Sequence, residues 1–465
     1  MSDPFGRFRF RRDILRAGVL ALTVCAAAAD ARASEPPAPD PKAGAAAYAQ
    51  SCARCHGAAG RGDGVDAKRF YPRPRDLTLG VYKFRSTASG TPPTDADLFR
   101  TITQGLPGTN MPDWQHLSEE TRWQLVHYLK SLSPIFTQTP PAPLAAAADP
   151  GPARASLPQG KALYEKLGCA ACHGAAGRAN GTSAAGLMDD WGMAIRPADL
   201  TQGWSYRGGS DPRAVMLRVM AGIDGAGMPS YAEAITPEEA WPLAYYVASL
   251  QEPPHWNMIA HPLRVQGALP TAADDPRWVS AERTDARLRN VVTPEGEWAT
   301  PPTVKAVTFE AIDNGEATAF RFSWDDPTES KDAAATPDRF VMALKPAGAQ
   351  GDVVTLQAWP YAGLPALDLC RWSAETGRAS EVIATSFDGP PGRALPAASA
   401  HYTDGRWRLV LQRPHHPAAP DGAATIAADG YTSIAFAVWD GGNPSARAVS
   451  PWVEISLRDN VRRAH

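Results

Sequence analysis

The stretch CARCHGAAGRGDG (residues 52–64) decides the fold, because it returns as CAACHGAAGRANG at residues 169–181. Each copy is followed by a second shared pattern, RPRDL at 73–77 and RPADL at 196–200. Both copies then reach a Gly-rich turn and a Met-Pro pair, and the separation from the first Cys to the Met is identical in each (52 to 111 and 169 to 228). Repetition at matched spacing predicts two copies of one domain.

Each repeat opens with the motif Cys-X-X-Cys-His. Two thiols three positions apart lie on one helical turn, so both can form thioethers to the vinyl groups of one porphyrin, and the adjacent His lies beneath the iron. A chance match, a redox Cys pair and a zinc site are the alternatives, and a second motif in the same context disfavours them. We therefore predict two covalently attached haem c groups, held by Cys52, Cys55 and His56 and by Cys169, Cys172 and His173.

A methionine is predicted as the second axial ligand of each iron. Such a Met must lie on a loop that is far from the His in sequence, as Met111 in GTNMPDW and Met228 in GAGMPSY do. The alternative is that both are core methionines. His116 and His127 are rival ligands in the first repeat, but their place on or near the terminal helix predicts a surface role. Four other methionines are expected in the core of the second repeat: Met188, Met193, Met216 and Met220.

Each repeat is predicted to end in a helix that packs across the Cys-bearing segment. Ser118 is a predicted N-cap in the first, while Thr236 begins a capping box in the second, where Pro242 should introduce a kink. With these helices, about 43–132 and 160–250 resemble class I cytochrome c domains, which are all-α. The resemblance implies that Arg85 and Arg207 pair with haem propionates, the alternative being ordinary solvated arginines.

The segment 1–33 has the features of an export signal peptide. Several Arg residues precede an apolar stretch at 17–29, and Ala31-Arg32-Ala33 fits a cleavage site. Arg11-Arg12 keeps the twin-arginine route open beside general secretion, and Cys25 lies in a poor lipoprotein box. We therefore expect a periplasmic protein. No other stretch reaches the roughly 18 apolar residues that span a bilayer, so no transmembrane span is expected in the mature chain.

Length and composition predict a multidomain globular protein. The 465 residues suffice for about three domains, and 44% hydrophobic with 20% charged residues is typical of a soluble chain. The net charge is −3, and it becomes −6 without the six Arg and three Asp of the segment 1–33, so no nucleic-acid surface is implied. We place the cytochrome domains at 36–133 and 159–252, joined by an extended, partly stiff Pro/Ala-rich linker at 134–158.

After about Pro253 the sequence changes to short alternating segments, which predict an all-β, sandwich-like domain at 260–462 or a partly open barrel. Phe320, Phe322 and Trp324 share one face of the clearest segment. The predicted strands are 304–309, 317–324, 339–344, 352–359, 406–412, 432–439 and 452–457.

An ordered series of short motifs runs through this domain. They are WDDP (324–327), DRF (338–340), the Trp372 strand, Arg413-Pro414, AFAVWDG (435–441) and Ser450-Pro451-Trp452. In this order, over about 263–457, they resemble the haem-binding gamma subunit of ethylbenzene dehydrogenase and related type II DMSO-reductase-like molybdenum enzymes. The resemblance implies a periplasmic redox partner, either a molybdenum oxidoreductase of the DMSO reductase type or another oxidoreductase.

Family members that bind haem b are expected to use a Met after the central strands and a Lys before the Ser-Pro-Trp segment. This chain has no Met between 343 and 372, and Arg447 takes the Lys position, where a guanidinium remains protonated. Substitutes exist in Met342, His401, His415 and His416. We expect that the domain holds no haem b and serves for docking, that Cys370 is buried and that His415-His416 faces solvent.

Together these features predict a periplasmic dihaem cytochrome c in which two His/Met centres pass single electrons. Electron transfer requires no general acid, nucleophile or substrate pocket, and we recognise none in the sequence, so no enzymatic activity of its own is expected. Two rivals remain. A dihaem peroxidase also carries two such motifs but needs one iron with an open distal position, and a haem-based sensor or scaffold would use the β domain to bind a ligand.

Overall fold

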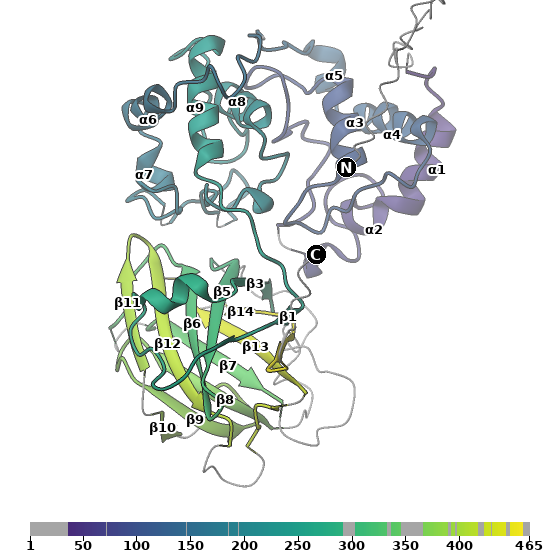
Figure 1. Cartoon of the computed structure of the whole chain (residues 1–465). Coiled ribbons are helices and arrows are strands. Elements are labelled where there is room, and N and C mark those ends of the chain that lie inside the picture. Colours follow the sequence, from purple (N-terminus) through teal and green to yellow (C-terminus); the bar gives the residue numbers. More distant parts are fainter. Residues whose placement is uncertain are drawn as a thin grey trace, which may run out of the picture. The chain divides into compact units, whose positions relative to one another are not determined.

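The computed structural model describes the chain from residue 36 to 458 with several gaps (Figure 1). The described ranges are 36–70, 72–145, 147–184, 186–193, 195–291, 303–332, 336–345, 366–388, 392–395, 398–416, 423–428, 430–442 and 447–458. The predicted signal peptide and the predicted strand at 352–359 lie outside these residues. None of the described helices has the length and apolar character needed to cross a bilayer.

The first repeat is helical, as predicted. Its elements are α1 (Pro41–Ser51), α2 (Ala53–His56), the 3-10 helix η1 (Ala67–Arg69), α3 (Asp95–Gln104), α4 (Glu119–Ser131) and α5 (Ile135–Gln138). Ser118 caps α4 through a hydrogen bond from the backbone N–H of Thr121, which confirms the predicted N-cap. Helix α1 crosses α4 at Gly44, where a β-carbon would lie 2.6 Å from the carbonyl oxygen of Gln124. The close crossing therefore requires glycine.

The second repeat has the same plan. It contains α6 (Leu157–Lys166), α7 (Ala170–His173), the 3-10 helix η2 (Gly203–Ser205), α8 (Pro212–Ala221) and α9 (Pro237–Ser249). The capping box of Thr236 and Glu239 is present, and Pro242 lies inside α9. Helix α6 crosses α9 at Gly160, the counterpart of Gly44, against the carbonyl of Pro242.

The methionines of the second repeat divide between core and surface. Met216 and Met220 lie in the buried cluster between α8 and α9, which confirms their predicted core role. Met188 is exposed, so the core prediction was wrong there, because this residue lies in a loop outside the helices. Met193, in the same loop region, is partly buried.

The segment between the repeats follows the surfaces of both domains. Its start is the short helix α5, so the predicted extended linker is extended only after Thr139. The N–H of Leu144 donates to the carbonyl of Ser86 (2.9 Å), and Trp241 Nε1 donates to the carbonyl of Ala147 (3.3 Å). These contacts tie the segment to the domain on either side.

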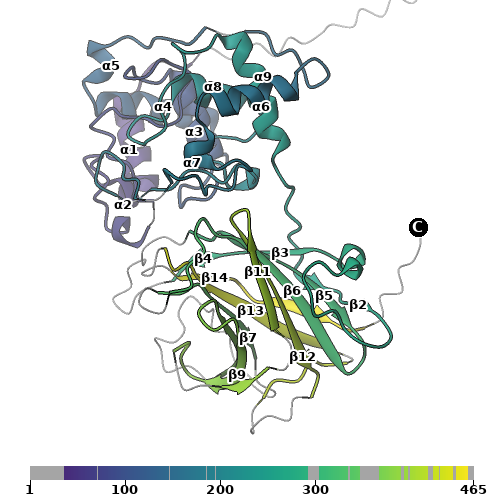
Figure 2. The same cartoon turned by 90° about the vertical axis from the view of Figure 1, so that its left-hand side faces the viewer.

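The C-terminal half consists of two β-sheets (Figures 1 and 2). One sheet has the path β1-β15-β13-β7-β8-β9-β10, with β14 paired to β13 and β4 paired to β14. The other has the path β11-β12-β6-β5-β2, with β3 paired to β5. The strands are β1 (Ile259–Ala260), β2 (Leu263–Arg264), β3 (Thr284–Arg287), β4 (Arg289–Asn290), β5 (Ala306–Asp313), β6 (Ala317–Asp325), β7 (Arg339–Leu344), β8 (Leu367–Ser373), β9 (Ala379–Ala384), β10 (Arg393–Ala394), β11 (Ala398–Thr403), β12 (Arg406–Pro414), β13 (Tyr431–Trp439), β14 (Arg447–Val449) and β15 (Val453–Ser456), and a 3-10 helix, η3 (Pro276–Ser280), precedes β3.

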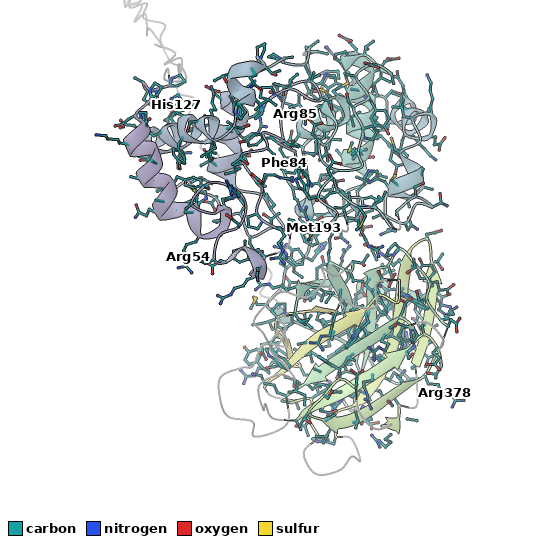
Figure 3. The ribbon with its side chains drawn as sticks, turned by 180° about the vertical axis from the view of Figure 1, so that it is seen from behind. Arg54, Phe84, Arg85, His127, Met193 and Arg378 are labelled. Atoms are coloured by element: carbon teal, nitrogen blue, oxygen red, sulfur yellow. The ribbon has the colours of Figure 1, made fainter. Side chains whose placement is uncertain are left out.

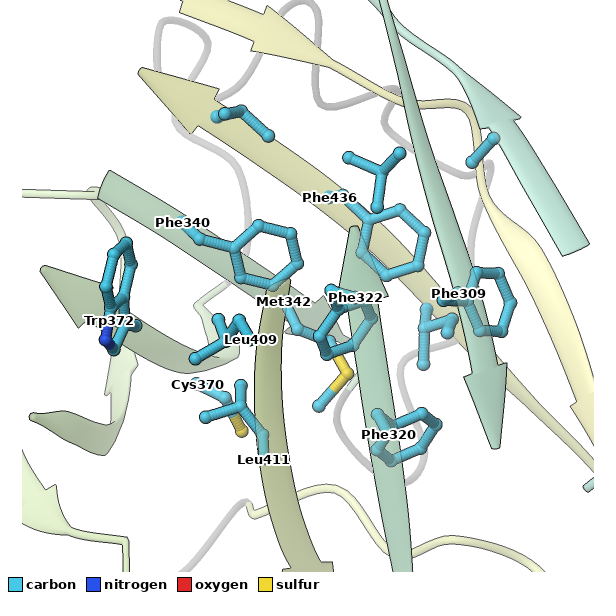
Figure 4. Close-up of a cluster of buried hydrophobic side chains, with 14 of the residues drawn as sticks. Phe309, Phe320, Phe322, Phe340, Met342, Cys370, Trp372, Leu409, Leu411 and Phe436 are labelled. Atoms are coloured by element: carbon cyan, nitrogen blue, oxygen red, sulfur yellow. The ribbon is translucent and has the colours of Figure 1, made fainter. Parts of the chain in front are cut away.

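An aromatic core lies between the two sheets (Figure 4). Phe320, Phe322 and Trp324 of β6 point inward, as their alternation predicted, and the Phe322 ring lies 4.6 Å from that of Phe340 on β7. Cys370 is fully buried in this core, as expected. Six of the seven predicted strands coincide with observed ones, whereas β9 and β11 were missed because their burial is weak.

Candidate haem sites

The two Cys-X-X-Cys-His motifs occupy equivalent helical turns, α2 and α7. The backbone N–H of His56 donates to the carbonyl of Cys52, and that of His173 to Cys169, both at 2.9 Å. The four motif cysteines are unpaired and partly exposed. Each turn therefore presents two thiols and one imidazole within five residues, the donor set that covalent attachment of a haem requires.

A backbone carbonyl orients each histidine ring. His56 Nδ1 lies 3.0 Å from the carbonyl oxygen of Arg75, and His173 Nδ1 lies 2.8 Å from that of Ala198. Donation from Nδ1–H leaves the lone pair of Nε2 for a metal. Burial lowers the pKa of both imidazoles, which favours the neutral, ligating form. Arg75 and Ala198 occupy the same position of the RPRDL and RPADL patterns, so the second shared pattern serves to hold the His.

A tyrosine from the preceding helix forms a hydrogen bond to the backbone next to each motif. Tyr48 donates to the carbonyl of Gly57 (2.8 Å) and Tyr164 to that of Gly174 (2.6 Å), the residue directly after the His in each repeat. The sequence analysis did not single out this pair. The available signal was an aromatic residue four or five positions before the first Cys in both copies.

The methionine loops also have matching geometry. The N–H of Leu106 donates to the carbonyl of Met111 (3.1 Å), and the N–H of Ile223 donates to that of Met228 (3.0 Å). Both loops leave a helix through a glycine with positive φ, Gly105 in the first and Gly222 in the second. The two loops thus close in the same way after α3 and α8.

In the second domain the predicted ligands meet at one cavity of about 1000 Å³. Cys169, Cys172, His173 and Met228 all line it, together with apolar side chains that include Leu200, Val219, Leu243 and Val247. The volume lies at the top of the roughly 300–1,000 Å³ range of cofactor sites. Thiols, an imidazole and a thioether around an apolar space fit a haem, which Cys169 and Cys172 would hold covalently and His173 and Met228 would ligate.

Cationic side chains gather around the same cavity. Arg207 lines it, and so does Lys305 of the β domain; the propionate pairing implied for Arg207 stays a prediction. Burial chiefly lowers the pKa of Arg218 to about 10. The full cationic lining described is Lys83, Arg178, Arg196, Arg207, Arg218, Arg287, Arg289 and Lys305. These charges suit the two carboxylates of a porphyrin. The sequence analysis did not identify Lys305 as a site residue, because Lys305 lies in another domain, far beyond the motif in the sequence.

Arg85, labelled in Figure 3, lies among other protein groups. Its side chain is 0% exposed; Nη2 lies 2.7 Å from Asp224 Oδ1 and donates to the carbonyl of Ala221 (2.9 Å), while Nη1 donates to Tyr82. The guanidinium is therefore neutralised inside the protein. These contacts favour an ion pair between the two cytochrome domains over the propionate pairing predicted for Arg85.

The rival ligands lie elsewhere. His116 is exposed beside Trp114, as expected, while His127 lies partly buried on α4 (Figure 3). In the β domain Met342 is enclosed by the aromatic core, whereas His401 and His416 are exposed.

One expectation about these histidines was wrong. His415 is 4% exposed, with Nε2 2.5 Å from Asp313 Oδ2, so it does not face solvent. A buried carboxylate needs such a partner, and that requirement was invisible in the sequence. Arg447, at the expected Lys position, lies over the ring of Phe387. The absence of haem b from this domain stays a prediction.

Two sequence families match the chain. Residues 39–129 match the family described as cytochrome c oxidase, cbb3-type, subunit III, and residues 158–251 match the cytochrome c family. A curated relative is the cbb3-type cytochrome c oxidase subunit CcoP of Azospirillum sp. (strain B510), which is 29% identical over 216 residues. That alignment covers 44% of this chain and 60% of the relative, so the chain spans less than two thirds of that protein's length.

Solved structures are similar to parts of the chain. A chain of the Kuenenia stuttgartiensis reducing HAO-like protein complex Kustc0457/Kustc0458 is 42% identical, covers 47% of this chain and 100% of its own length, and has a TM-score of 0.45. A carbohydrate binding module family 9 (CBM9) from Caldicellulosiruptor kristjanssonii in complex with cellotriose is 10% identical and covers 42% of this chain and 83% of its own, with a TM-score of 0.27.

Proposed function

Because the chain carries two cytochrome c domains, at 39–129 and 158–251, we propose that it is a periplasmic dihaem cytochrome c that passes single electrons to or from a partner oxidoreductase. One observation carries this proposal: the complete ligand set occurs twice with the same supporting hydrogen bonds. In each domain a carbonyl holds Nδ1 of the motif His, and a closed loop presents a Met.

The residues around each centre have roles that suit electron transfer. A bound haem supplies a one-electron iron couple. His56 with Met111 and His173 with Met228 would ligate the two irons, and a Met ligand would raise the reduction potential. In the second domain the apolar lining would shield the bound group from water, while Arg207 and Lys305 would offset its carboxylate charge. A Met donor beside each motif would favour electron transfer over peroxidase chemistry, which needs an open distal position.

Export and docking complete the proposal. Covalent haem attachment takes place outside the cytoplasm, which agrees with the signal peptide expected at 1–33. We assign the β domain to docking of a redox partner, and the family resemblance favours a molybdenum oxidoreductase of the DMSO reductase type. The similarity to a chain of a reducing HAO-like complex supports assembly with another redox protein as the broader alternative.

Haem content and ligation provide the first test. A haemochrome assay on the mature protein should give two c-type haems and no extractable haem b. The ferric protein should show the weak absorption band of Met-ligated haem at about 695 nm, and the ferrous protein should not bind carbon monoxide. Binding of carbon monoxide by the wild type would favour the peroxidase reading, and an extractable haem b would contradict the docking-only role of the β domain.

Single substitutions should then separate the two centres. Met111→Leu and Met228→Leu should each remove about half of the absorption at about 695 nm and lower one of two midpoint potentials, because each removes one thioether ligand. Met193→Leu is the matched control, since Met193 lies outside both loops (Figure 3). Unchanged potentials in either loop variant would refute His/Met ligation at that centre.

The partner requires its own experiment. In a stopped-flow assay, the reduced protein should be oxidised by, or the oxidised protein reduced by, a purified periplasmic molybdenum oxidoreductase of this class. Failure of both directions, with two intact His/Met centres, would reject that partner class while leaving the dihaem assignment in place. Tight binding of a small molecule by the β domain, with no electron exchange, would instead favour the sensor reading.

A further inference from the structure

Three aspartates of the β domain meet at one end of the two sheets. Asp326 follows β6, Asp338 precedes β7, and Asp440 follows β13. Strands β7 and β13 are antiparallel neighbours in which Arg339 pairs with Trp439, so the residues just beyond this pair, Asp338 and Asp440, lie close together. Asp326 arrives from the opposite sheet. One carboxylate oxygen of each lies within 4.8 Å of the other two.

This aspartate cluster is removed from water. Asp326 and Asp338 are 0% exposed and Asp440 is 2% exposed. Among the residues that the structure describes, Arg196 is the cation within ion-pair range, with Nη2 3.5 Å from Asp440 Oδ2. Three buried carboxylates opposite one guanidinium carry more negative charge than a protein interior holds without a further partner.

Two carboxylate oxygens of the cluster have no hydrogen-bond donor among the described residues. Asp326 Oδ1 accepts from the N–H of Thr328 (3.1 Å), but Asp326 Oδ2, fully buried, accepts from no described group. Asp440 repeats this arrangement: Oδ1 accepts from the N–H of Gly442 (2.8 Å) and from Thr328 Oγ1 (3.1 Å), while Oδ2 accepts no hydrogen bond from the described residues. One oxygen of each carboxylate is thus held by backbone N–H groups; Asp326 Oδ2 is left for a ligand, and Asp440 Oδ2 has Arg196 at ion-pair distance but no hydrogen bond.

The third carboxylate is fixed in place. Asp338 Oδ1 accepts from the N–H of Gly441 (2.7 Å), and Oδ2 accepts from the N–H of Ser330 (2.8 Å) and from Trp407 Nε1 (3.0 Å). A side chain at Gly441 would overlap the carbonyl oxygen of Thr336. The glycine therefore permits the close approach of backbone to Asp338, and the cluster is pre-organised.

We propose that Asp326, Asp338 and Asp440 bind a calcium ion that ties the two sheets together. The cluster offers oxygen atoms and neither sulfur nor imidazole, which favours a hard cation over zinc or copper. Calcium accepts about six to eight oxygens in irregular geometry, so carboxylates from two sheets, the Thr328 hydroxyl and water suit it. Magnesium demands near-ideal octahedral geometry and fits such a site less well.

Calorimetry on the complete haem-loaded protein tests the site. After treatment with a chelator and at fixed ionic strength, titration with CaCl₂ should show one ion per chain with a Kd of about 1 mM or tighter, and Ca²⁺ should raise the Tm. Asp326→Asn should weaken binding at least tenfold and remove most of the Tm shift. Asp388→Asn, which removes an exposed carboxylate of the same domain, should behave as wild type.

Several outcomes would overturn the proposal. Absence of both binding heat and a Tm shift in the wild type at about 10 mM Ca²⁺ would do so whatever the variants show. Binding that persists at full strength in both Asp326→Asn and Asp440→Asn would locate the ion elsewhere. An equal Tm shift with Mg²⁺ would reject calcium as the ligand. None of these readouts depends on electron transfer, so the proposed function stands or falls separately.

Discussion

Asp224 lies four residues before Met228, and Pro107 lies at the equivalent place, four residues before Met111. The Asp224 carboxylate accepts hydrogen bonds from Ser89 Oγ (2.7 Å) and from the N–H of Gly90 (3.0 Å), and pairs with Arg85. Proline offers no such acceptor. The first cytochrome domain therefore holds the methionine loop of the second, whereas the Met111 loop lacks this arrangement.

Replacing Asp224 by Ala should loosen the Met228 loop. The change leaves the buried Arg85 guanidinium without its carboxylate, a loss of about 3 kcal/mol for a broken buried pair. We expect a weaker absorption band at about 695 nm and partial carbon monoxide binding by the ferrous protein. Spectra recorded in the Met111→Leu background would isolate the second centre.

The control for this loop is Glu233→Ala, which removes an exposed carboxylate five residues beyond Met228. It should leave the spectra unchanged. Wild-type absorption and no carbon monoxide binding in a folded Asp224→Ala protein would show that the Met228 loop keeps its shape without the first domain.

Gly160→Ala should destabilise the second cytochrome domain. The new methyl group would overlap the carbonyl oxygen of Pro242 where α6 crosses α9, so the helices must separate. Overpacking of this kind costs roughly 1–3 kcal/mol and should lower the Tm measured by circular dichroism. Ala162→Ser, at an exposed position of the same helix, should change stability by less than about 0.5 kcal/mol. If Gly160→Ala had the same Tm as wild type, helices α6 and α9 would have to lie further apart at Gly160 than in the structure.

Arg413→Leu should destabilise the β domain. Arg413 Nη2 lies 2.5 Å from Asp368 Oδ2 and 3.0 Å from Glu381 Oε1. The substitution leaves the buried Asp368 without a cation, with the N–H of Ala424 as its remaining donor, while Glu381 keeps its pair with Arg393. Breaking such a buried group costs about 3–5 kcal/mol, detectable by scanning calorimetry. The exposed Arg378→Leu serves as control (Figure 3). Faster reaction of the buried Cys370 with a thiol reagent should accompany the loss, and unaltered melting of Arg413→Leu would contradict this assignment.

Lys83 should make stability depend on pH. Its ammonium lies 3.9 Å from Asp189, and burial is the main cause that lowers its pKa to about 8. The unfolded chain keeps the proton up to a pKa of about 10.4, so between these values it binds more protons than the folded chain. The free energy of unfolding contributed by Lys83 therefore rises as the pH increases from about 8 to 10.

Denaturant unfolding at several pH values measures this contribution. The stability difference between wild type and Lys83→Met should shift in favour of wild type as the pH rises through that window, whereas Lys68→Met, at an exposed position, should show no such trend. A difference that is constant from about pH 7 to 10 would indicate an ordinary pKa for Lys83.

Local rules explain what sequence reasoning reached. The Cys and His of each motif lie within five residues, so one helical turn predicts their placement, and Phe320, Phe322 and Trp324 reveal a buried face through simple alternation. The same reasoning failed for His415 and Arg85. Their partners, Asp313 and Asp224, lie far away along the chain. Burial of a charged group next to such a distant partner produces no periodic pattern in the sequence.

The sequence alone identified the two cytochrome c domains, because thioether attachment demands particular atoms at short, repeated separations, as in the motifs that begin at Cys52 and Cys169. Tertiary structure decided which charges meet. Lys305 reaches the second cavity, and Asp326 and Asp440 converge, only because strands distant in the chain end at neighbouring points. Ligand identity follows from bonding rules that operate within a turn, whereas electrostatic environment depends on how whole elements pack, and packing is a property of the assembled fold.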